Sequence, residues 1–482
     1  MNAAVSILDW PAELADEHPL ALWDAVSVAR ATGGMAVGDF QLAGVEIDSR
    51  DVLEGDLFFA LKGESMDGHR FVPGALDKGA IAAVVDRPVA GPHVLVEDTT
   101  AALVALGQAA RARSQARIIG VTGSVGKTSV KEAIYAALDR GSRGAAHRSV
   151  KSYNNHVGVP LSLARMPAHA RFGIFEMGMN HAGEIAALTR QVRPHVAVIT
   201  TIAPAHIEML GSEEAIADAK AEIFFGLEPG GVAVIPADSP HFERLRSAAL
   251  GWNADVVSFG RADHADVRLL DAVAAPGGGS LVTVNMGDRR LCYTVSSPGE
   301  HHVINSLAVM AAVRAVRGDL GAAGLALGEM EGLAGRGARL TIATRDGEAL
   351  LIDESYNANP ASMRATLAQL GATEARRRIA VLGAMKELGT HGPDFHAALA
   401  SPIAEANVDF ALLVGEEMTP LAEELGKSGH SALGKRVAFA HCANVDEAVD
   451  SLRKCGLERG DAVLVKGSNS VGLARLVAAL KG

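Results

Sequence analysis

Apolar runs and helical stretches alternate along most of the chain. From about residue 80 onward, apolar runs such as 81–85, 172–177, 196–202 and 232–236 lie between segments with helical periodicity. Strands that alternate with helices are typical of repeated βαβ units, which build mostly parallel sheets. The pattern therefore predicts an α/β fold.

Three segments differ in pattern, and 482 residues are too many for one ordinary core. We predict a first domain over 1–113, with strands at 55–61 and 81–85 and a closing helix at 99–113. The second, 114–334, opens with a strand that runs into a glycine turn and a helix at about 127–139; antiparallel strands at 256–294 and a helix at 302–316 complete it. The glycine-rich stretch 332–339 marks a hinge before 335–482, where the alternation predicts a doubly wound sheet.

Composition narrows the classes of function. With 45 basic and 56 acidic residues, net charge −11, the chain has no general attraction for nucleic acid or an anionic membrane. Three cysteines, Cys292, Cys442 and Cys455, are far apart and lack metal-binding spacing, so we expect reduced core thiols. Acidic residues near the N-terminus and the lack of a run of 18 apolar residues predict no signal peptide, no transmembrane segment and a cytoplasmic location.

The strongest local signal is a glycine turn between a buried strand and a helix, Gly120-Val-Thr-Gly-Ser-Val-Gly-Lys-Thr128. In such a loop the backbone N–H groups converge on phosphate oxygens, Lys127 adds a positive charge, and the Thr128 hydroxyl can bind Mg²⁺. The standard phosphate loop has glycine where this chain has Val121. The alternative is an ordinary glycine turn with an incidental lysine. The predicted ATP-binding loop comprises Gly120, Thr122, Gly123, Ser124, Val125, Gly126, Lys127 and Thr128.

Polar residues follow neighbouring strands at positions suited to a metal site. Glu176 and His206 each come just after a buried apolar run. Doubly wound sheets build their sites at the carboxyl ends of strands. Either residue alone could be structural. Lys220 lies in a helical stretch, where a solvated lysine is the default interpretation.

A second polar string, Asp353 to Pro360, follows the predicted strand 349–352. Pro360 suits the first turn of a helix, and Asn359 suits the N-cap position. The string either faces a cleft or is a plain helix start.

Taken together, these motifs resemble the Mur ligases of peptidoglycan synthesis over nearly the whole chain. That family also has glycine at the position of Gly120. The resemblance implies an N-terminal α/β domain that binds the UDP-linked substrate, with Ser49 and Arg50 near its diphosphate. It also implies a central phosphate-loop ATPase with a mostly parallel sheet, and a C-terminal Rossmann-like domain that closes over ATP and binds the incoming amine.

The resemblance also assigns roles to individual residues. Asn155, Glu176 and His206 belong with Mg²⁺ and the phosphates, and Lys220 falls where the family carries a lysine carboxylated by CO₂. Catalysis would then fall to Lys127, Glu176, His206 and Lys220, with Thr128, Glu176, His206 and Lys220 around the metal. Asn305 would contact adenine, although the family usually has asparagine at the position of His302. Arg336 and Asp353 would approach ATP at the hinge, and Asn357 and Asn359 would hold D-alanyl-D-alanine. Lys466 matches the family without an assigned role.

The resemblance implies an ATP-dependent ligase that acts through an acyl phosphate. Relatives that add a single amino acid usually differ at the string Asp353 to Pro360, so the resemblance favours a ligase that joins D-alanyl-D-alanine to UDP-N-acetylmuramoyl-tripeptide. We expect a monomer that binds no nucleic acid. One alternative is a related ligase, either a Mur enzyme that adds a single amino acid or a folylpolyglutamate synthetase. Another is a non-catalytic binding protein that uses the loop as a nucleotide switch.

Overall fold

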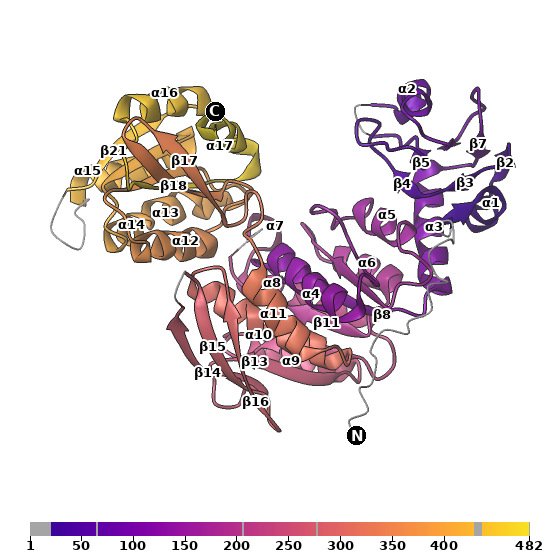
Figure 1. Ribbon diagram of the computed structural model, residues 1–482, viewed down its shortest axis with the longest axis horizontal. Helices are drawn as coiled ribbons and strands as arrows, with labels where there is room; N and C mark the ends of the chain where they lie inside the picture. Colours follow the sequence, from indigo (N-terminus) through magenta and orange to yellow (C-terminus); the bar gives the residue numbers. More distant parts are fainter. Residues whose placement is uncertain (1–20, 64–65, 205–206, 276–277, 429–435, 482) are drawn as a thin grey trace, which may run out of the picture. The chain divides into compact units, whose positions relative to one another are not determined.

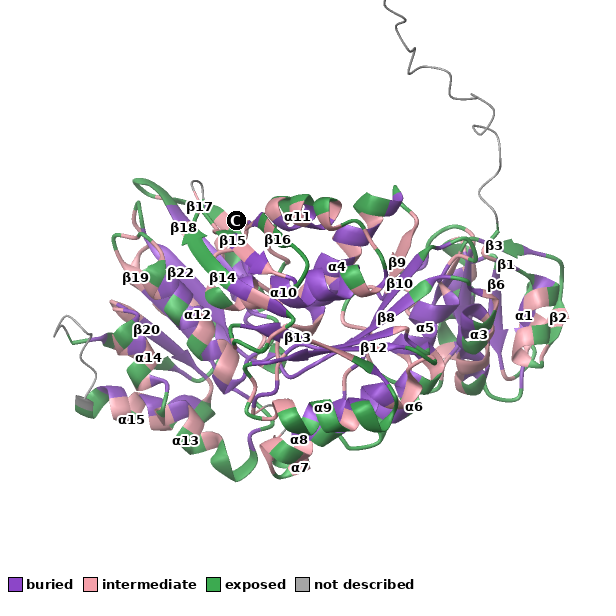
Figure 2. Ribbon diagram, turned by 90° about the horizontal axis from the view of Figure 1, so that it is seen from below, coloured by how far each residue is buried: buried purple, intermediate pink, exposed green. Residues whose placement is uncertain are grey.

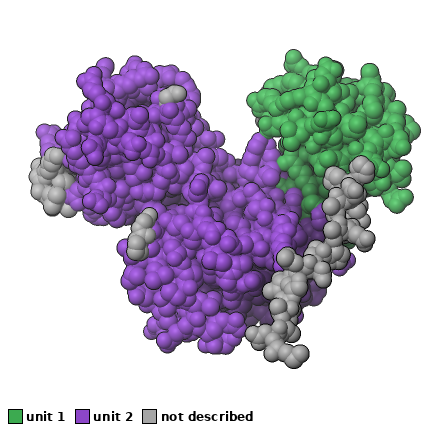
Figure 3. All heavy atoms as spheres, viewed as in Figure 1, with its two compact units in different colours: residues 1–114, 160–168 green, residues 115–159, 169–482 purple. Residues whose placement is uncertain are grey.

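The structure is a computed structural model that describes residues 21–63, 66–204, 207–275, 278–428 and 436–481 (Figure 1). The chain divides into two compact units. One comprises residues 1–114 and 160–168, and the other residues 115–159 and 169–482 (Figure 3). Each unit is described by itself.

The first unit is built on a five-stranded sheet. Its order is β2 (Met35–Val37), β7 (His93–Leu95), β6 (Ala82–Val85), β5 (Asp56–Phe59) and β4 (Gly44–Glu46), parallel except for β2. A short ladder pairs β1 (Trp23–Asp24) with β3 (Gln41–Leu42). The helices are α1 (Ala25–Thr32), α2 (Val72–Asp77) and α3 (Thr99–Arg113). Asp98 caps α3, because its side chain accepts hydrogen bonds from the N–H groups of Thr100 and Ala101.

The second unit contains a nine-stranded sheet in the order β16-β15-β14-β13-β12-β11-β8-β10-β9. Its parallel strands are β8 (Arg117–Thr122), β9 (Ala146–Arg148), β10 (Phe172–Glu176), β11 (Val196–Ile199), β12 (Val232–Pro236), β13 (Asp255–Gly260) and β14 (Val267–Ala274). Only β15 (Ser280–Asn285) and β16 (Arg290–Val295) continue antiparallel. The predicted antiparallel region 256–294 is therefore wrong at its start, since β13 still pairs in parallel with both neighbours.

Helices cover both faces of this sheet (Figure 2). On one face lie α4 (Lys127–Ser142), α10 (Glu300–Ala315) and α11 (Leu320–Glu329), and on the other α6 (Glu184–Val192), α8 (Glu213–Ala221) and α9 (Phe242–Gly251). The short helix α7 (Ile207–Leu210) follows β11, and α5 (Gly158–Ala164), most of which belongs to the first unit, follows β9. A large apolar cluster including Ile119, Ile134 and Leu307 packs α4 and α10 onto the strands. The strand ends that carry the polar motifs are thereby held at one edge.

The same unit contains a six-stranded sheet, parallel except for its edge strand β17. The order is β17 (Ala338–Thr344), β18 (Gly347–Glu354), β22 (Ala462–Lys466), β19 (Arg378–Gly383), β20 (Phe410–Val414) and β21 (Ala438–Cys442). One face packs on α12 (Pro360–Ala372), α13 (Gly392–Ala397), α14 (Ala400–Glu405) and α15 (Thr419–Ser428), the other on α16 (Val445–Cys455) and α17 (Ala474–Lys481). This is the doubly wound arrangement that the sequence predicts. Within the described ranges, no helix is both long and apolar enough to cross a membrane.

Candidate functional site

The turn between β8 and α4 can be formed only with glycine at two positions. Gly123 and Gly126 have φ angles of 146° and 86°, which residues with a side chain rarely adopt. A Cβ atom on Gly123 would also lie 2.0 Å from the Thr200 hydroxyl oxygen. That hydroxyl donates a hydrogen bond of 2.6 Å to the Val125 carbonyl. The turn is therefore held closely against the segment that follows β11.

Ser124 strengthens the same contact. Its N–H donates to the Thr201 carbonyl at 2.7 Å, and its hydroxyl donates to the Ala203 carbonyl at 2.9 Å. Helix α4 then starts without a side-chain cap. An uncapped helix start directs its N–H groups and positive dipole end at whatever binds there, which favours an anion.

Glu176 is the centre of the polar cluster at the strand ends. Its side chain accepts hydrogen bonds from the Thr128 hydroxyl at 2.7 Å and from the Asn154 amide at 2.8 Å. Because β8 and β10 are adjacent and parallel, their carboxyl ends bring α4 and Glu176 together. Asn155, which the resemblance assigned here, instead accepts hydrogen bonds from the N–H groups of Val157 and Gly158. Asn154 is the residue that the sequence interpretation missed, since only the loop conformation distinguishes these adjacent asparagines.

Lys127 lies beside this cluster. Its ammonium donates a hydrogen bond to the Gly123 carbonyl at 2.7 Å. Burial lowers the pKa of Lys127, while the Glu176 carboxylate raises it and Arg336 lowers it further. The lysine therefore lies where an anionic ligand on the turn would stabilise its charge.

Lys220 is buried rather than solvated, with 1% of its surface exposed at the end of α8. Burial, and then the nearby Lys127 charge, hold the pKa of Lys220 well below its usual range. Among the residues that the structure describes, no carboxylate forms an ion pair with Lys220. The burial of Lys220 excludes the default interpretation of a solvated surface lysine.

The oxygen donors fit a hard divalent cation. The Thr128 hydroxyl and Glu176 carboxylate supply the ligand type that Mg²⁺ prefers, whereas an unmodified Lys220 amine does not. His206 lies outside the described residues. Within those residues, no group of three or more His, Cys, Asp or Glu side chains could hold a metal ion.

A cavity of about 370 Å³ adjoins these groups. It brings together predicted residues from the phosphate turn, the strand ends, α10 and the segment after β18. They are Ser124, Val125, Gly126, Lys127, Glu176, Asn305, Arg336, Asn357 and Asn359. Gly120 does not line the cavity, since it lies inside β8 and faces Met177. The Thr122 hydroxyl is buried at the end of β8, with no hydrogen-bond partner in the structure.

The hinge before β17 is organised by Asp353. One of its carboxylate oxygens accepts from the Gly335 N–H at 2.9 Å, and the other accepts from the N–H and hydroxyl of Ser355 at 3.1 and 2.6 Å. Gly335 has a φ of 72° and lies against Tyr356. The guanidinium of Arg336 stacks over the Tyr356 ring and donates to the Ser152 hydroxyl at 3.0 Å. The structure therefore places Asp353 on the hinge backbone, while Arg336 lines the cavity.

Both predicted asparagines after β18 bond to the backbone. The Asn359 side chain accepts from the Ser362 N–H at 2.9 Å and is the N-cap of α12. The Asn357 side chain accepts from the Ala358 N–H at 2.8 Å, and the Asn357 carbonyl accepts from the Lys466 ammonium at 2.9 Å. Both side chains nonetheless line the cavity, and Lys466 is buried beside them.

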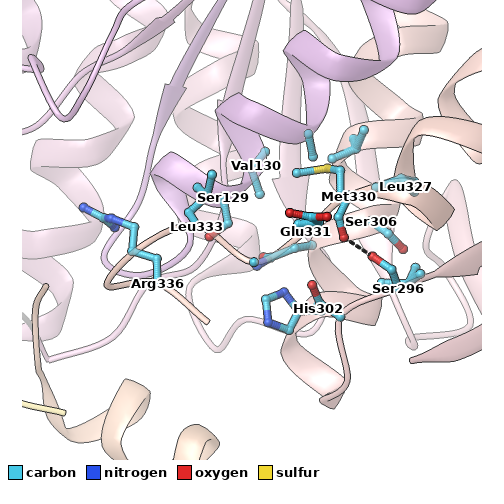
Figure 4. Close-up of a pocket in the computed structure, with 16 residues that line it drawn as sticks. Ser129, Val130, Ser296, His302, Ser306, Leu327, Met330, Glu331, Leu333 and Arg336 are labelled. Carbon is cyan, nitrogen blue, oxygen red and sulfur yellow. Dashed lines mark hydrogen bonds between the residues drawn. The ribbon is translucent and has the colours of Figure 1, made fainter. Parts of the chain in front are cut away.

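The start of α10 separates the main cavity from a smaller one of about 50 Å³. Figure 4 shows the lining of the smaller cavity, with Val130 from α4, His302 from α10 and Met330 from the segment that follows α11. Asn305 lines both cavities and lies against Gly126. The rings of His301 and His302 are 4.0 Å apart, and burial lowers their pKa values to about 4 and about 3. Both imidazoles are therefore neutral near pH 7.

Ser49 and Arg50 belong to the first unit, in the segment that follows β4. The Arg50 guanidinium pairs with Asp48 at 2.7 Å and is largely exposed.

Comparisons with known proteins identify the family. Models of the Mur ligase family catalytic domain, the Mur ligase middle domain and the Mur ligase glutamate ligase domain match residues 41–142, 121–313 and 338–469. The UDP-N-acetylmuramoyl-tripeptide–D-alanyl-D-alanine ligase of Synechocystis sp. is 36% identical over 460 residues, which cover 92% of each chain. This chain belongs to the Mur ligase family.

Solved structures agree with that assignment. A crystal structure of MurF from Acinetobacter baumannii matches with a TM-score of 0.80 and 30% identity, covering 95% of this Mur ligase and 98% of that chain. The MurF ligase of Thermotoga maritima, crystallised in complex with ADP, matches with a TM-score of 0.73 and 25% identity, covering 91% and 97%. The predictions of a three-domain α/β architecture and of an ATP-dependent ligase are confirmed.

Proposed function

We propose that this Mur ligase uses ATP to join D-alanyl-D-alanine to UDP-N-acetylmuramoyl-tripeptide. The observation that carries the proposal is a single cavity lined by both the phosphate turn and the polar segment after β18. The Synechocystis relative, similar along almost its whole length, bears the name of that reaction. Two substrates activated and joined in sequence need adjoining sites of this kind.

In the first step the terminal carboxylate of the tripeptide attacks the γ-phosphorus of ATP. A P–O bond forms, the bond to the bridging β,γ-oxygen breaks, and ADP leaves. The protein's contribution is positioning and charge stabilisation, since phosphoryl transfer needs little covalent help. The turn from Gly123 to Gly126 would bind the phosphates through its backbone N–H groups, except that of Ser124, which donates to the Thr201 carbonyl. Lys127 would offset the negative charge of the phosphates.

Thr128, Glu176 and His206 would hold Mg²⁺, which supplies charge neutralisation to the phosphates. Lys220 would complete this set as a carbamate: the neutral amine attacks the carbon of CO₂, an N–C bond forms, one C=O π bond opens and a proton is released. The carbamate would offer Mg²⁺ an anionic oxygen, which this cation prefers to an amine nitrogen. The lowered pKa of Lys220 supports that form. Asn154 and Thr128 would orient the Glu176 carboxylate through the hydrogen bonds described above.

In the second step the amine of the dipeptide attacks the acyl carbon. The tetrahedral intermediate collapses as the C–O bond to phosphate breaks, giving the amide and inorganic phosphate. The acyl phosphate must be kept from water, and the hinge at Gly335 and Arg336 provides a point for closure. Asn357 is the better placed of the two asparagines to hold the dipeptide, because its side chain is exposed, whereas Asn359 is buried as the N-cap of α12.

The remaining assignments complete the proposal. Ser49 and Arg50 would bind the UDP end in a domain of residues 1–113, Asn305 would contact adenine within a domain of residues 114–334, and residues 335–482 would form the closing domain. We propose that the enzyme acts in the cytoplasm as a monomer.

The decisive experiment supplies ATP, D-alanyl-D-alanine and each UDP-N-acetylmuramoyl-tripeptide, with lysine or meso-diaminopimelate as third residue. Mass spectrometry should detect the pentapeptide with at least one of them, together with one phosphate per amide formed. Single amino acids and a folate with glutamate serve as controls. Product from either control, with none from the dipeptide, would replace the proposal with one of the related ligase reactions.

A separate test addresses Lys220. Lys220→Ala should lose activity, and added short carboxylic acids should restore part of it by replacing the carbamate oxygens. Protein equilibrated with ¹³C-labelled CO₂ should show a carbamate carbon signal that Lys220→Ala lacks. An active Lys220→Ala enzyme, or identical spectra for both proteins, would remove the carbamate from the mechanism.

A further inference from the structure

Lys131 is a buried cation that the proposed chemistry does not use. It lies on α4, one turn beyond Lys127, and its surface is 0% exposed. It does not line the main cavity of about 370 Å³. An ammonium is costly to bury, so packing alone would favour an apolar residue here. The position therefore calls for another explanation.

The ammonium has two carbonyl acceptors and one carboxylate partner. The Lys131 Nζ atom donates to the Ser149 carbonyl at 2.8 Å and to the Lys151 carbonyl at 2.9 Å, and it pairs with Glu132 at 2.9 Å. Two of these acceptors belong to the segment 149–154 that follows β9. Lysine has only donors, so two carbonyl acceptors and a neighbouring carboxylate offset the cost of burying its charge.

The segment 149–154 needs such support. Lys151 has a φ of 52°, in the left-handed region that residues with side chains seldom adopt. Such a conformation persists only where the surroundings fix it. The two carbonyls held by Lys131 lie at the start of the segment and at the strained residue itself.

The other side of the same segment faces Glu176. The Ser149 hydroxyl accepts from the Glu176 N–H at 3.2 Å, and the Asn154 amide donates to the Glu176 carboxylate at 2.8 Å. The Gly178 N–H donates to the Asn154 carbonyl at 2.8 Å, which fixes the end of the segment. A change in this segment would therefore move the carboxylate.

We propose that Lys131 is a positioning residue that holds segment 149–154 and, through Asn154, orients the Glu176 carboxylate. The proposal rests on the proposed function of Glu176. In this proposal Lys131, which lies outside the cavity, determines how Asn154 and Glu176 are arranged inside it.

The test is a double-mutant cycle with Lys131→Met and Asn154→Ala. Each single variant should lower kcat about 10- to 100-fold, the range expected for coupled neighbours. If Lys131 acts through Asn154, Lys131→Met should cost no more than about threefold in the Asn154→Ala background. Independent, multiplicative losses would overturn the proposal, as would an unimpaired Lys131→Met enzyme.

A binding measurement separates positioning from general damage. The affinity for a fluorescent ADP analogue is measured with and without Mg²⁺. In Lys131→Met the ratio of the Kd without Mg²⁺ to the Kd with Mg²⁺ should be about tenfold smaller than in the wild type. The Kd without Mg²⁺ should stay within about twofold of the wild-type value, since the turn Gly123 to Gly126 is unchanged. Equal losses under both conditions would mean that Lys131 is only structural, and would overturn the proposal.

Glu132→Gln is the matched control. It removes the carboxylate charge that Lys131 and Arg148 share but keeps both carbonyl contacts of Lys131, so it should lower the unfolding midpoint and leave the Mg²⁺ effect unchanged. If Lys131→Met does not fold, Lys131→Gln replaces it, since its amide can still reach one carbonyl. That variant should give an intermediate loss of the Mg²⁺ effect, and no loss would overturn the proposal. An inactive wild-type enzyme would instead contradict the proposed function itself.

Discussion

The carboxyl ends of β8 and β10 differ sharply from the carboxyl end of β18. At the end of β10, polar side chains bond to one another: Glu176 accepts from Thr128, which follows β8, and from Asn154, which follows β9. At the end of β18, Asp353 bonds to nearby backbone N–H groups, and after the strand Asn359 does the same. The first arrangement leaves a carboxylate and backbone donors directed at the cavity. The second consumes its polar groups in shaping the hinge and the start of α12.

This difference shows how much can be predicted from polar residues at the end of a strand. Polar residues after a buried strand indicate where a site lies, because parallel strands bring their carboxyl ends to one edge. They do not indicate whether a given side chain contacts ligand or holds backbone. Substitutions at the two strand ends should therefore have effects of different kinds.

The largest effect is expected at the phosphate turn. Lys127→Met removes the charge that would face the phosphates, so kcat should fall about 10³-fold, as for the loss of one preorganised charge-stabilising group. The unfolding midpoint should stay level or rise, since burial already disfavours the Lys127 charge. Phosphate release and calorimetry measure the two quantities.

If Lys127→Met also lowers the unfolding midpoint by several degrees, Lys127 is a structural residue like Asp353 and Asn359. That result would contradict the difference between the two strand ends. Arg140→Met on the same helix is the control. Its guanidinium pairs with Glu329 on the surface, so its loss should cost little in either quantity.

Much of the fold was predictable from the pattern of residues. The helix at 99–113 has the bounds observed for α3, and the glycine turn lies where the string Gly120 to Thr128 indicates. These features follow from local periodicity and from glycine chemistry. The start of the antiparallel strands was not predictable. The strand β13 pairs in parallel with both neighbours, and the residue pattern of a strand does not encode the direction of its neighbours.

The site was predictable in position more than in detail. The pairing of Glu176 with Thr128 follows from strand adjacency. The choice of Asn154 over Asn155 depends on the path of the intervening loop, which the left-handed Lys151 redirects. Likewise the burial of Lys220 depends on packing by elements distant in sequence. Such contacts leave no local signature.

A smaller effect is expected at Asp353. Asp353→Asn leaves an amide donor opposite either the Gly335 N–H or the Ser355 N–H, so a buried donor loses its acceptor. The free energy of unfolding should fall by about 2 kcal/mol, the usual cost of one unsatisfied buried group. Activity should fall by about tenfold, because Arg336 follows Gly335 directly. Urea unfolding and phosphate release provide the measurements.

In Asp353→Asn we expect the loss of unfolding free energy to be the primary effect and the loss of activity to follow from it, in contrast to Lys127→Met. A variant that unfolds like the wild type yet loses all activity would place Asp353 among the ligand-binding groups instead. Ser355→Ala, which removes one donor and leaves no amide unsatisfied, should cost less in both measurements.

Two substitutions of Asn359 distinguish its role as a helix cap from a role in binding the dipeptide. Asn359→Ala removes the acceptor for the Ser362 N–H, so unfolding free energy should fall by about 1 kcal/mol. Asn359→Ser keeps an acceptor at the N-cap and should restore the stability. The KM for D-alanyl-D-alanine should be normal in Asn359→Ser. A raised KM with normal stability would show that the amide also contacts the dipeptide.

The smallest effect is expected at Asn357, the exposed member of the pair. Asn357→Ala keeps the carbonyl that accepts from Lys466 and loses only a hydrogen bond to the next N–H, so unfolding free energy should change by less than about 0.5 kcal/mol. If its amide holds the dipeptide, KM for D-alanyl-D-alanine should rise about threefold, the effect of one modest hydrogen bond, with kcat and KM for ATP unchanged. Asn359→Ser provides the matched comparison on the same cavity. Unchanged KM in both variants would mean that the whole segment after β18 is framework and that the dipeptide is held elsewhere.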